Sequence, residues 1–257
     1  MIRFSRGVVF IKTVLFDIDR TILRCNGAGK KAMVMASEEV YGTRGLMEEY
    51  NFQGRTDSLI LRESLIPAGI SENTLTAGLD RFKERYFSLL EGLIREYDVV
   101  LLPGVEDLLR ALNGRDDVFV GLLTGNYAEG ARIKLSRFGL NGYFRTGVFA
   151  DDTAIRNEMP CIARERLKSD HGWNCDFRDI YIIGDTIYDL ECARTWGAVS
   201  VAVATGWTGR DVLLSQEPDY FFEHLGDTAA VLEIFEKDII PVLSDQELPS
   251  AGSEYRP

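Results

Sequence analysis

The segment TVLFDIDRTIL, which runs from Thr13 to Leu23, decides the fold and points to a site. Its first residues are mostly apolar, and this pattern is typical of a strand buried on both faces. The run ends in Asp17 and Asp19, whose side chains point the same way if the extended backbone continues. Two such carboxylates repel each other unless a cation lies between them or one is protonated. We therefore expect a site at the strand end; the alternative is a turn in which Asp19 caps the next element.

The bulk composition narrows the class of protein. The length of 257 residues permits one large domain, or a domain with a smaller one inserted. A net charge of -11 opposes attraction to nucleic acid or to an anionic membrane, so we expect neither as a partner. The opening residues are interrupted by Lys12, and we interpret them as part of a core strand rather than a leader. Four cysteines without metal-ligand spacing favour a reduced, cytoplasmic setting.

The hydrophobic pattern changes twice along the chain. Over about residues 26–98 the apolar positions recur at three-and-four spacing, which predicts helices alone. From residue 99 onwards, short β-rich runs alternate with helical segments, the signature of a parallel α/β sheet. We expect a Rossmann-like α/β core domain from residues 1–25 and 99–243, an inserted helical cap domain at 26–98, and a disordered tail at 244–257.

Polar residues follow each predicted strand, at the edge where open parallel sheets bind ligands. This edge carries many carboxylates, which destabilise a fold unless a hard divalent cation is bound. Oxygen ligands without histidine suit Mg²⁺ far better than zinc. The residues concerned are Asp17, Asp19, Thr21, Thr124, Gly125, Asn126, Asp151, Asp152, Gly184, Asp185, Thr186 and Asp189.

Three of these strand-end segments resemble known motifs. LFDIDRTIL (15–23), LLTGN (122–126) and YIIGDTIYDLECARTWG (181–197) resemble the first, second and fourth motifs of the haloacid dehalogenase superfamily. The branch is that of small-molecule phosphatases similar to phosphoglycolate phosphatases, whose helical cap lies between the first two motifs. Order and spacing together carry the resemblance, which extends over roughly residues 8 to 225. It implies a Mg²⁺-dependent phosphatase that acts on a small phosphorylated metabolite.

The resemblance also implies catalytic roles. Asp17 would attack phosphorus to form an aspartyl-phosphate, and Asp19 would be the general acid and base. Thr124, with the backbone N–H groups of Gly125 and Asn126, would hold phosphoryl oxygens. For Thr124 a helix N-cap is the alternative.

The implied Mg²⁺ ligands are Asp17, Asp19, Asp185 and Asp189. The spacing of Asp185 and Asp189 places their carboxylates one helical turn apart on the same face. Asp189 would be either a further ligand or a support for the ligands; a solvated acid in the first helical turn is the alternative.

The sequence departs from the family pattern at two positions. Arg20 stands where the family most often has Gly; it would face solvent, or hinder or steer the leaving group. The third motif lacks its usual lysine. We predict that Arg156 replaces it at a helix start, with a solvent-facing loop arginine as the alternative. Lys134 is expected to lie too far along its helix to reach the strand ends.

The expected cap contains the segment FQGRTDSLI, which resembles a cap-loop motif of the same branch. Arg55 would reach an anionic group of the substrate, or else is an ordinary surface arginine. Either Thr56 or Asp57 would cap the following helix.

Rival functions remain beside the phosphatase. A phosphomutase of the β-phosphoglucomutase type shares these motifs and returns the phosphoryl group to a sugar. Dehalogenation is disfavoured, because it would leave Mg²⁺ and the Asp19 acid/base without a purpose. A catalytically silent binding or regulatory protein is suggested by Arg20 and by the missing lysine.

Overall fold

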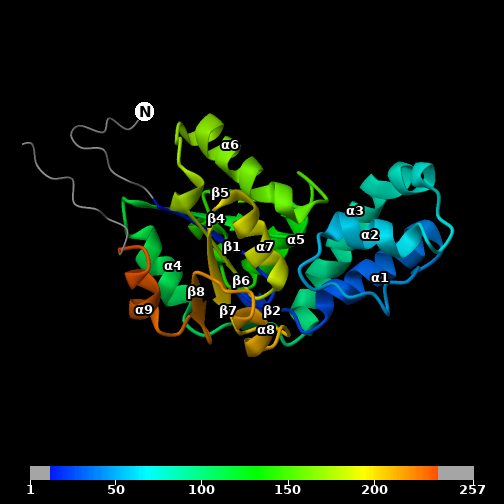
Figure 1. Ribbon diagram of the computed structural model, residues 1–257. Helices are drawn as coiled ribbons and strands as arrows, with labels where there is room; N and C mark the ends of the chain where they lie inside the picture. Colours follow the sequence, from blue (N-terminus) through cyan, green and yellow to red (C-terminus); the bar gives the residue numbers. More distant parts are fainter. Residues whose placement is uncertain (1–11, 237–257) are drawn as a thin grey trace, which may run out of the picture.

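The core of the molecule is a parallel six-stranded sheet (Figure 1). The computed structural model describes residues 12–236. The strand order is β5-β4-β1-β6-β7-β8, and every neighbouring pair is parallel. This confirms the expected Rossmann-like α/β fold. The strands are β1 Lys12–Phe16, β4 Val118–Leu123, β5 Thr146–Val148, β6 Ile180–Gly184, β7 Val199–Val203 and β8 Tyr220–Phe222.

Strand β1 lies in the middle of the sheet, and all five of its residues are buried. Val14 and Phe16 face one side, where they share a hydrophobic cluster with residues of α4, α5 and α9. Leu15 faces the other side, where it shares a second cluster with α6 and α7. Burial on both faces explains why this strand is apolar without alternation. The helices are α4 Val105–Asn113, α5 Ala128–Ser136, α6 Met159–His171, α7 Ile187–Trp196, α8 Arg210–Leu214 and α9 Thr228–Glu233.

Three helices form a separate layer beside the sheet (Figure 1), in the stretch where the cap is expected. They are α1 Ala28–Tyr41, α2 Asp57–Leu65 and α3 Glu72–Glu96. The chain leaves and returns through a two-stranded antiparallel pair, β2 Leu23–Arg24 and β3 Val100–Leu101. One hydrophobic cluster continues from α1 and α3 into the core through Tyr127, whose ring meets that of Tyr86 edge-on.

Three 3₁₀ turns complete the described elements: η1 Leu140–Tyr143, η2 Arg156–Glu158 and η3 Phe177–Asp179. The predicted leading part of the first strand, the tail at 244–257, and the outer limits of the core domain at 1 and 243 lie outside the described residues.

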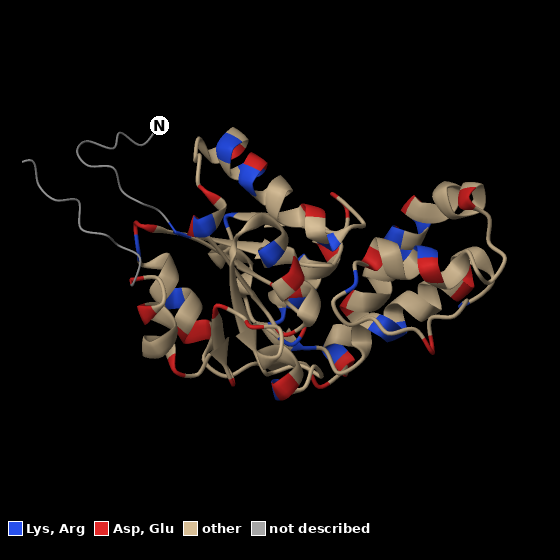
Figure 2. Cartoon of the chain, in the orientation of Figure 1, with Lys and Arg blue, Asp and Glu red and all other residues tan. Residues whose placement is uncertain are grey.

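Charged residues of both signs are interspersed on the outer helices. Figure 2 shows this along α6, whose sequence MPCIARERLKSDH mixes arginine and lysine with glutamate and aspartate. Between residues 12 and 236, every helix is too short or too polar to cross a membrane.

Candidate active site

The carboxyl ends of β1, β4 and β6 meet at a cavity of about 210 Å³. Its wall combines residues that follow these strands with residues of α1, α3 and the loop before α2. Asp17, Asp19 and Asp185 line it from the strand side, and Gly54 and Arg55 line it from the loop side. Groups that are far apart in sequence thus face one cavity.

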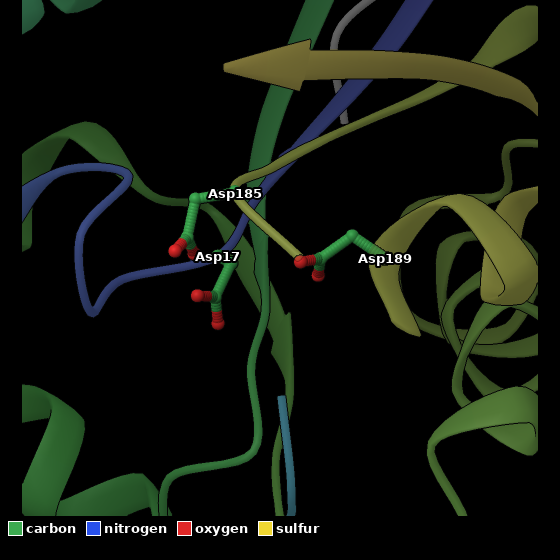
Figure 3. A group of neighbouring side chains, drawn as sticks. All are labelled: Asp17, Asp185 and Asp189. Carbon is green, nitrogen blue, oxygen red and sulfur yellow. The ribbon is translucent and has the colours of Figure 1, made fainter. Parts of the chain in front are cut away.

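Three buried carboxylates lie close together at the strand ends (Figure 3). Asp17, Asp185 and Asp189 each place one oxygen within 4.8 Å of the others, and all three side chains are buried. Burial raises the pKa of Asp17 to about 6, and the nearby carboxylates add to the rise. Burial together with Asp189 and Asp17 raises the pKa of Asp185 well above its usual value. The positive charge near the three carboxylates is therefore too small to balance their negative charge.

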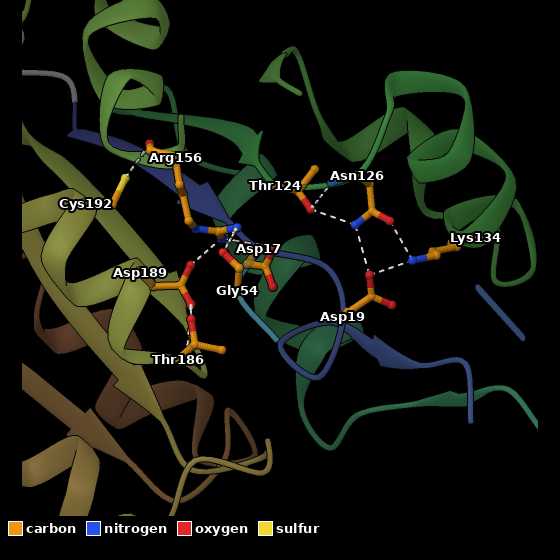
Figure 4. Close-up of polar contacts among 10 residues, drawn as sticks. All are labelled: Asp17, Asp19, Gly54, Thr124, Asn126, Lys134, Arg156, Thr186, Asp189 and Cys192. Carbon is orange, nitrogen blue, oxygen red and sulfur yellow. Dashed lines mark hydrogen bonds and ion pairs between the residues drawn. The ribbon is translucent and has the colours of Figure 1, made fainter. Parts of the chain in front are cut away.

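Arg156 supplies part of that charge. Its Nη2 lies 2.5 Å from Asp189 Oδ1 and 3.3 Å from Asp17 Oδ1 (Figure 4), and its side chain is only 7% exposed. Burial alone would lower the pKa of Arg156, but the two carboxylates reverse this and hold it above its usual value. Its Nε is buried without a hydrogen-bond partner among the described residues. Arg156 therefore faces Asp17, in contrast to the alternative of a solvent-facing loop arginine.

Both carboxylate oxygens of Asp189 are bound by protein groups. Its Oδ2 accepts hydrogen bonds from the backbone N–H and the hydroxyl of Thr186, at 3.0 and 2.7 Å, which closes a capping box at the start of α7. Oδ1 receives Arg156. Asp189 is fully buried, so it is not a solvated acid, and it does not line the cavity. It orients Arg156 and the loop that carries Asp185.

A second polar network surrounds Asp19 (Figure 4). The Asn126 amide donates to Asp19 Oδ2 at 2.9 Å and to the Thr124 hydroxyl at 2.8 Å. Lys134 Nζ lies 2.5 Å from Asp19 Oδ2 and 2.5 Å from Asn126 Oδ1. Burial raises the pKa of Asp19, but the Lys134 ammonium outweighs it and leaves that pKa below its usual value. Asn126 lines the cavity, whereas Thr124 is fully buried behind it.

The expectation that Lys134 cannot reach the strand ends is wrong. Helix α5 begins only at Ala128, so Lys134 lies about 9 Å along its axis. Side chains of a helix tilt toward its N-terminus, and this tilt returns the lysine to the strand end. The separation expected from the sequence was too large because it neglected the start of the helix and the tilt of its side chains.

The loop before α2 docks onto the core at the second motif. Asp57 N donates to Gly125 O at 2.7 Å, and Tyr127 N donates to Asp57 Oδ2 at 2.8 Å. A Cβ on Gly125 would lie 2.2 Å from Arg55 O, so only glycine permits this approach. Thr56, and not Asp57, caps α2 by accepting from Leu59 N.

Two further arginines line the cavity. The Arg55 guanidinium lies 4.9 Å from the centroid of the Tyr188 ring, so Arg55 is a cavity residue as well as a loop residue. The Arg20 guanidinium stacks on Trp207 and also lines the cavity, so it faces the site. Gly125, predicted to bind phosphoryl oxygens, lines the cavity as well.

Sequence reasoning missed two residues of this region. Lys134 was discounted by distance, although its place two turns into a helix that starts at a strand end was an available signal. Asp57 was considered only as a cap, whereas its buried carboxylate joins the loop to the core. Burial raises the pKa of Asp57 to about 7, a shift opposed by the Lys134 charge. No local pattern marks such a contact, because its partner is 70 residues away.

Comparison with known proteins decides the family. A family model described as haloacid dehalogenase-like hydrolase matches residues 14–203. The chain belongs to this family. It is 27% identical, over 89% of its length and 97% of the relative's, to a putative pyrophosphatase PpaX from Caldanaerobacter subterraneus subsp. tengcongensis. A phosphoglycolate phosphatase from Synechococcus elongatus is 30% identical over 49% of this chain and 57% of its own.

The fold of the haloacid dehalogenase-like hydrolases is also found among solved structures. The crystal structure of a predicted phosphatase from Clostridium acetobutylicum matches with a TM-score of 0.66 and 20% identity, and covers 87% of this chain and 99% of that one. The family match confirms the expected haloacid dehalogenase-type hydrolase. The phosphatase names of its relatives agree with the expected phosphoric monoester hydrolase.

Proposed function

We propose that the protein is a Mg²⁺-dependent phosphatase that hydrolyses a small phosphorylated metabolite through an aspartyl-phosphate. One observation carries the proposal: Asp17 lines the cavity, with Arg156 Nη2 3.3 Å from its Oδ1 and the carboxylate of Asp185 close by. A carboxylate so placed faces an incoming phosphoryl group together with the positive charge that lets the two approach.

In the first step an Asp17 oxygen bonds to phosphorus while the bond to the leaving oxygen breaks. The leaving oxygen takes a proton from Asp19. A dianionic phosphoryl group beside Asp19 favours the protonated form that this step requires, against the effect of Lys134. In the second step Asp19 takes a proton from the water that attacks the aspartyl-phosphate, and Asp17 is released.

Arg156 and the second motif bind the phosphoryl group. Arg156 lines the cavity, where its guanidinium would contact a phosphoryl oxygen beside Asp17. Gly125 and Asn126 also line the cavity, where their backbone N–H groups would bind phosphoryl oxygens. Thr124 does not line the cavity, but its hydroxyl accepts a hydrogen bond from the Asn126 amide and would hold Asn126 in position.

The residues of the site fit a magnesium ion. Three buried carboxylates within reach of one another form an all-oxygen donor set, and the raised pKa values of Asp17 and Asp185 express a need for positive charge. Asp17 and Asp185 would hold the ion, because both carboxylate oxygens of Asp189 are bound by protein donors and Asp19 Oδ2 is bound by Asn126 and Lys134. Bound Mg²⁺ would supply the charge that offsets repulsion between Asp17 and the phosphoryl group.

The names of the relatives support a small phosphorylated substrate, since one is a putative pyrophosphatase and the other a phosphoglycolate phosphatase. The size of the cavity, about 210 Å³, agrees with a small metabolite. The free cysteines agree with a cytoplasmic location.

The test is release of phosphate from a panel of phosphorylated metabolites with Mg²⁺, using wild type and Asp17→Asn. Wild type should hydrolyse at least one member, and mass spectrometry should find the phosphorylated enzyme only in wild type. Asp107→Asn, an exposed aspartate of α4, is the matched control and should retain activity. Turnover by Asp17→Asn would assign the nucleophile elsewhere, and return of phosphoryl to a sugar would identify a phosphomutase.

A further inference from the structure

Arg20 adopts a backbone conformation that arginine rarely adopts. Its φ of 65° lies in the left-handed region, where a β-carbon is strained and glycine is favoured. The surroundings hold it there: the Thr205 hydroxyl donates to Arg20 O, and the Arg20 Cζ lies 3.5 Å from the centroid of the Trp207 ring. Trp207 is 67% exposed and lines the same cavity. These contacts stabilise a strained backbone conformation, which suggests that the Arg20 side chain has a function.

Arg24 lies four residues after Arg20, in the short strand β2, and also lines the cavity. Its Nε is a buried donor with no hydrogen-bond partner in the described part of the chain. A buried donor without a partner is costly, so its presence beside the cavity suggests a function for the Arg24 side chain.

The two guanidinium groups are close enough to influence each other. Burial lowers the pKa of Arg20 and the Arg24 charge lowers it further, whereas Asp185 and Asp19 act in the opposite direction. Among residues 12–236, neither Arg20 nor Arg24 forms an ion pair with a carboxylate. Arg156 and Lys134 differ from them, because each is already bound to a carboxylate.

We propose that Arg20 and Arg24 form a second anion subsite, which binds a carboxylate or a second phosphoryl group on the leaving-group part of the substrate. Trp207 holds the Arg20 guanidinium in place from its other face. The inference rests on the proposed function and narrows it to phosphate esters that carry a second anionic group.

Three substrates that share one phosphate ester test the subsite. Phosphoglycolate carries a carboxylate, ethylene glycol bisphosphate carries a second phosphoryl group, and ethylene glycol monophosphate carries a neutral hydroxyl. The quantity measured is the ratio of kcat/KM for each anionic substrate to that for the neutral one. Wild type should favour at least one anionic substrate by about tenfold or more, and the favoured one tells carboxylate from phosphoryl recognition.

Variants then show which residues cause the preference for an anionic substrate. Arg24→Gln and Arg20→Gly should each lower the ratio by about tenfold, the loss expected for a hydrogen bond to a charged group. Glycine suits the φ of 65° at position 20, so this variant removes the side chain without backbone strain. Arg110→Gln, an exposed arginine of α4, is the matched control and should keep the wild-type ratio. A general defect of folding lowers all three rates and leaves the ratio unchanged.

Arg55 is the rival cation at this cavity, so Arg55→Gln is measured beside the others. If only Arg55→Gln lowers the ratio, or if wild type shows no preference, the subsite at Arg20 and Arg24 is refuted. Isothermal titration calorimetry of phosphoglycolate and ethylene glycol monophosphate gives the same comparison without turnover. A preference in binding that Arg24→Gln removes supports the subsite even if no substrate is hydrolysed, an outcome that would overturn only the proposed function.

Discussion

The cations around the cavity form two groups, here called the inner part (Arg156 and Lys134) and the outer part (Arg20 and Arg24). At the inner part, Arg156 and Lys134 are buried, and each is bound to carboxylates that follow strands or begin a helix. At the outer part, Arg20 and Arg24 have no such partners among the described residues. Under the proposed function, the paired cations would hold the reacting carboxylates in position, and the unpaired cations would contact the substrate. The difference would separate groups that assemble the site from groups that select the substrate.

The strongest way to break the inner part is Arg156→Ala. We expect kcat/KM to fall by about two orders of magnitude or more, because Asp17 then faces the phosphoryl group without its cation. From the sequence alone, no change in thermal stability would be expected. The structure changes this expectation: Asp17 and Asp189 would be left buried and unpaired, so Tm should fall by about 5 °C or more.

Arg156→Lys should recover part of both losses, and Arg110→Ala in α4 is the exposed control. Steady-state kinetics and calorimetry measure the two effects separately. Activity within a few-fold of wild type in Arg156→Ala would exclude Arg156 from the site.

A smaller effect is expected for Lys134→Met, which breaks the pair with Asp19. Removing the ammonium should raise the pKa of Asp19, because Lys134 is what holds it below its usual value. Because the first step requires protonated Asp19, the alkaline limb of the kcat/KM profile should therefore move to higher pH. Loss of the contacts by which Lys134 positions Asp19 and Asn126 should lower activity by about tenfold to a hundredfold. Lys168→Met is the exposed control. A wild-type pH profile in Lys134→Met would mean that the pair has no part in the reaction.

The proposed magnesium site should make the free energy of unfolding depend on pH and on Mg²⁺ together. The pKa values of Asp17, about 6, and of Asp185 are raised in the folded state. The folded protein then binds more protons than the unfolded one, so stability without metal falls as pH rises from about 4 to about 6 and beyond.

Saturating Mg²⁺ should restore a few degrees of Tm at about pH 8 and much less at about pH 5. Differential scanning calorimetry with Mg²⁺ or with a chelator measures this. Asp185→Asn should abolish most of the gain. Equal gains at both pH values would contradict a carboxylate site.

The smallest effect concerns the backbone of the outer part. Arg20→Gly should change Tm by less than about 2 °C, since relief of the left-handed strain offsets the lost stacking on Trp207. Arg20→Val should lower Tm more, because a β-branched residue is poorly tolerated at this φ. Equal Tm values for the two variants would show that the observed conformation imposes no strain.

Much of the fold could be predicted from local patterns. The buried run at β1 and the alternation after residue 99 predicted the parallel sheet, and the carboxyl-end rule brought Asp17, Asp19 and Asp185 to one edge. Strand β8 and the short pair β2–β3 were not predicted, because three-residue and two-residue strands carry too little pattern. The limits of the expected cap and the roles of the site residues remain predictions.

By itself, the sequence determined the sheet, the family and the strand ends that bear the carboxylates, because each depends on hydrophobic spacing or on residues close together in the chain. Only the tertiary structure decided which cation meets which carboxylate. Lys134 and Asp19 are 115 positions apart, and their contact depends on where α5 starts and how its side chains tilt. The unpaired state of Arg20 and Arg24 likewise depends on every group that packs around them. Such contacts follow from packing over long sequence separations, which no local pattern records.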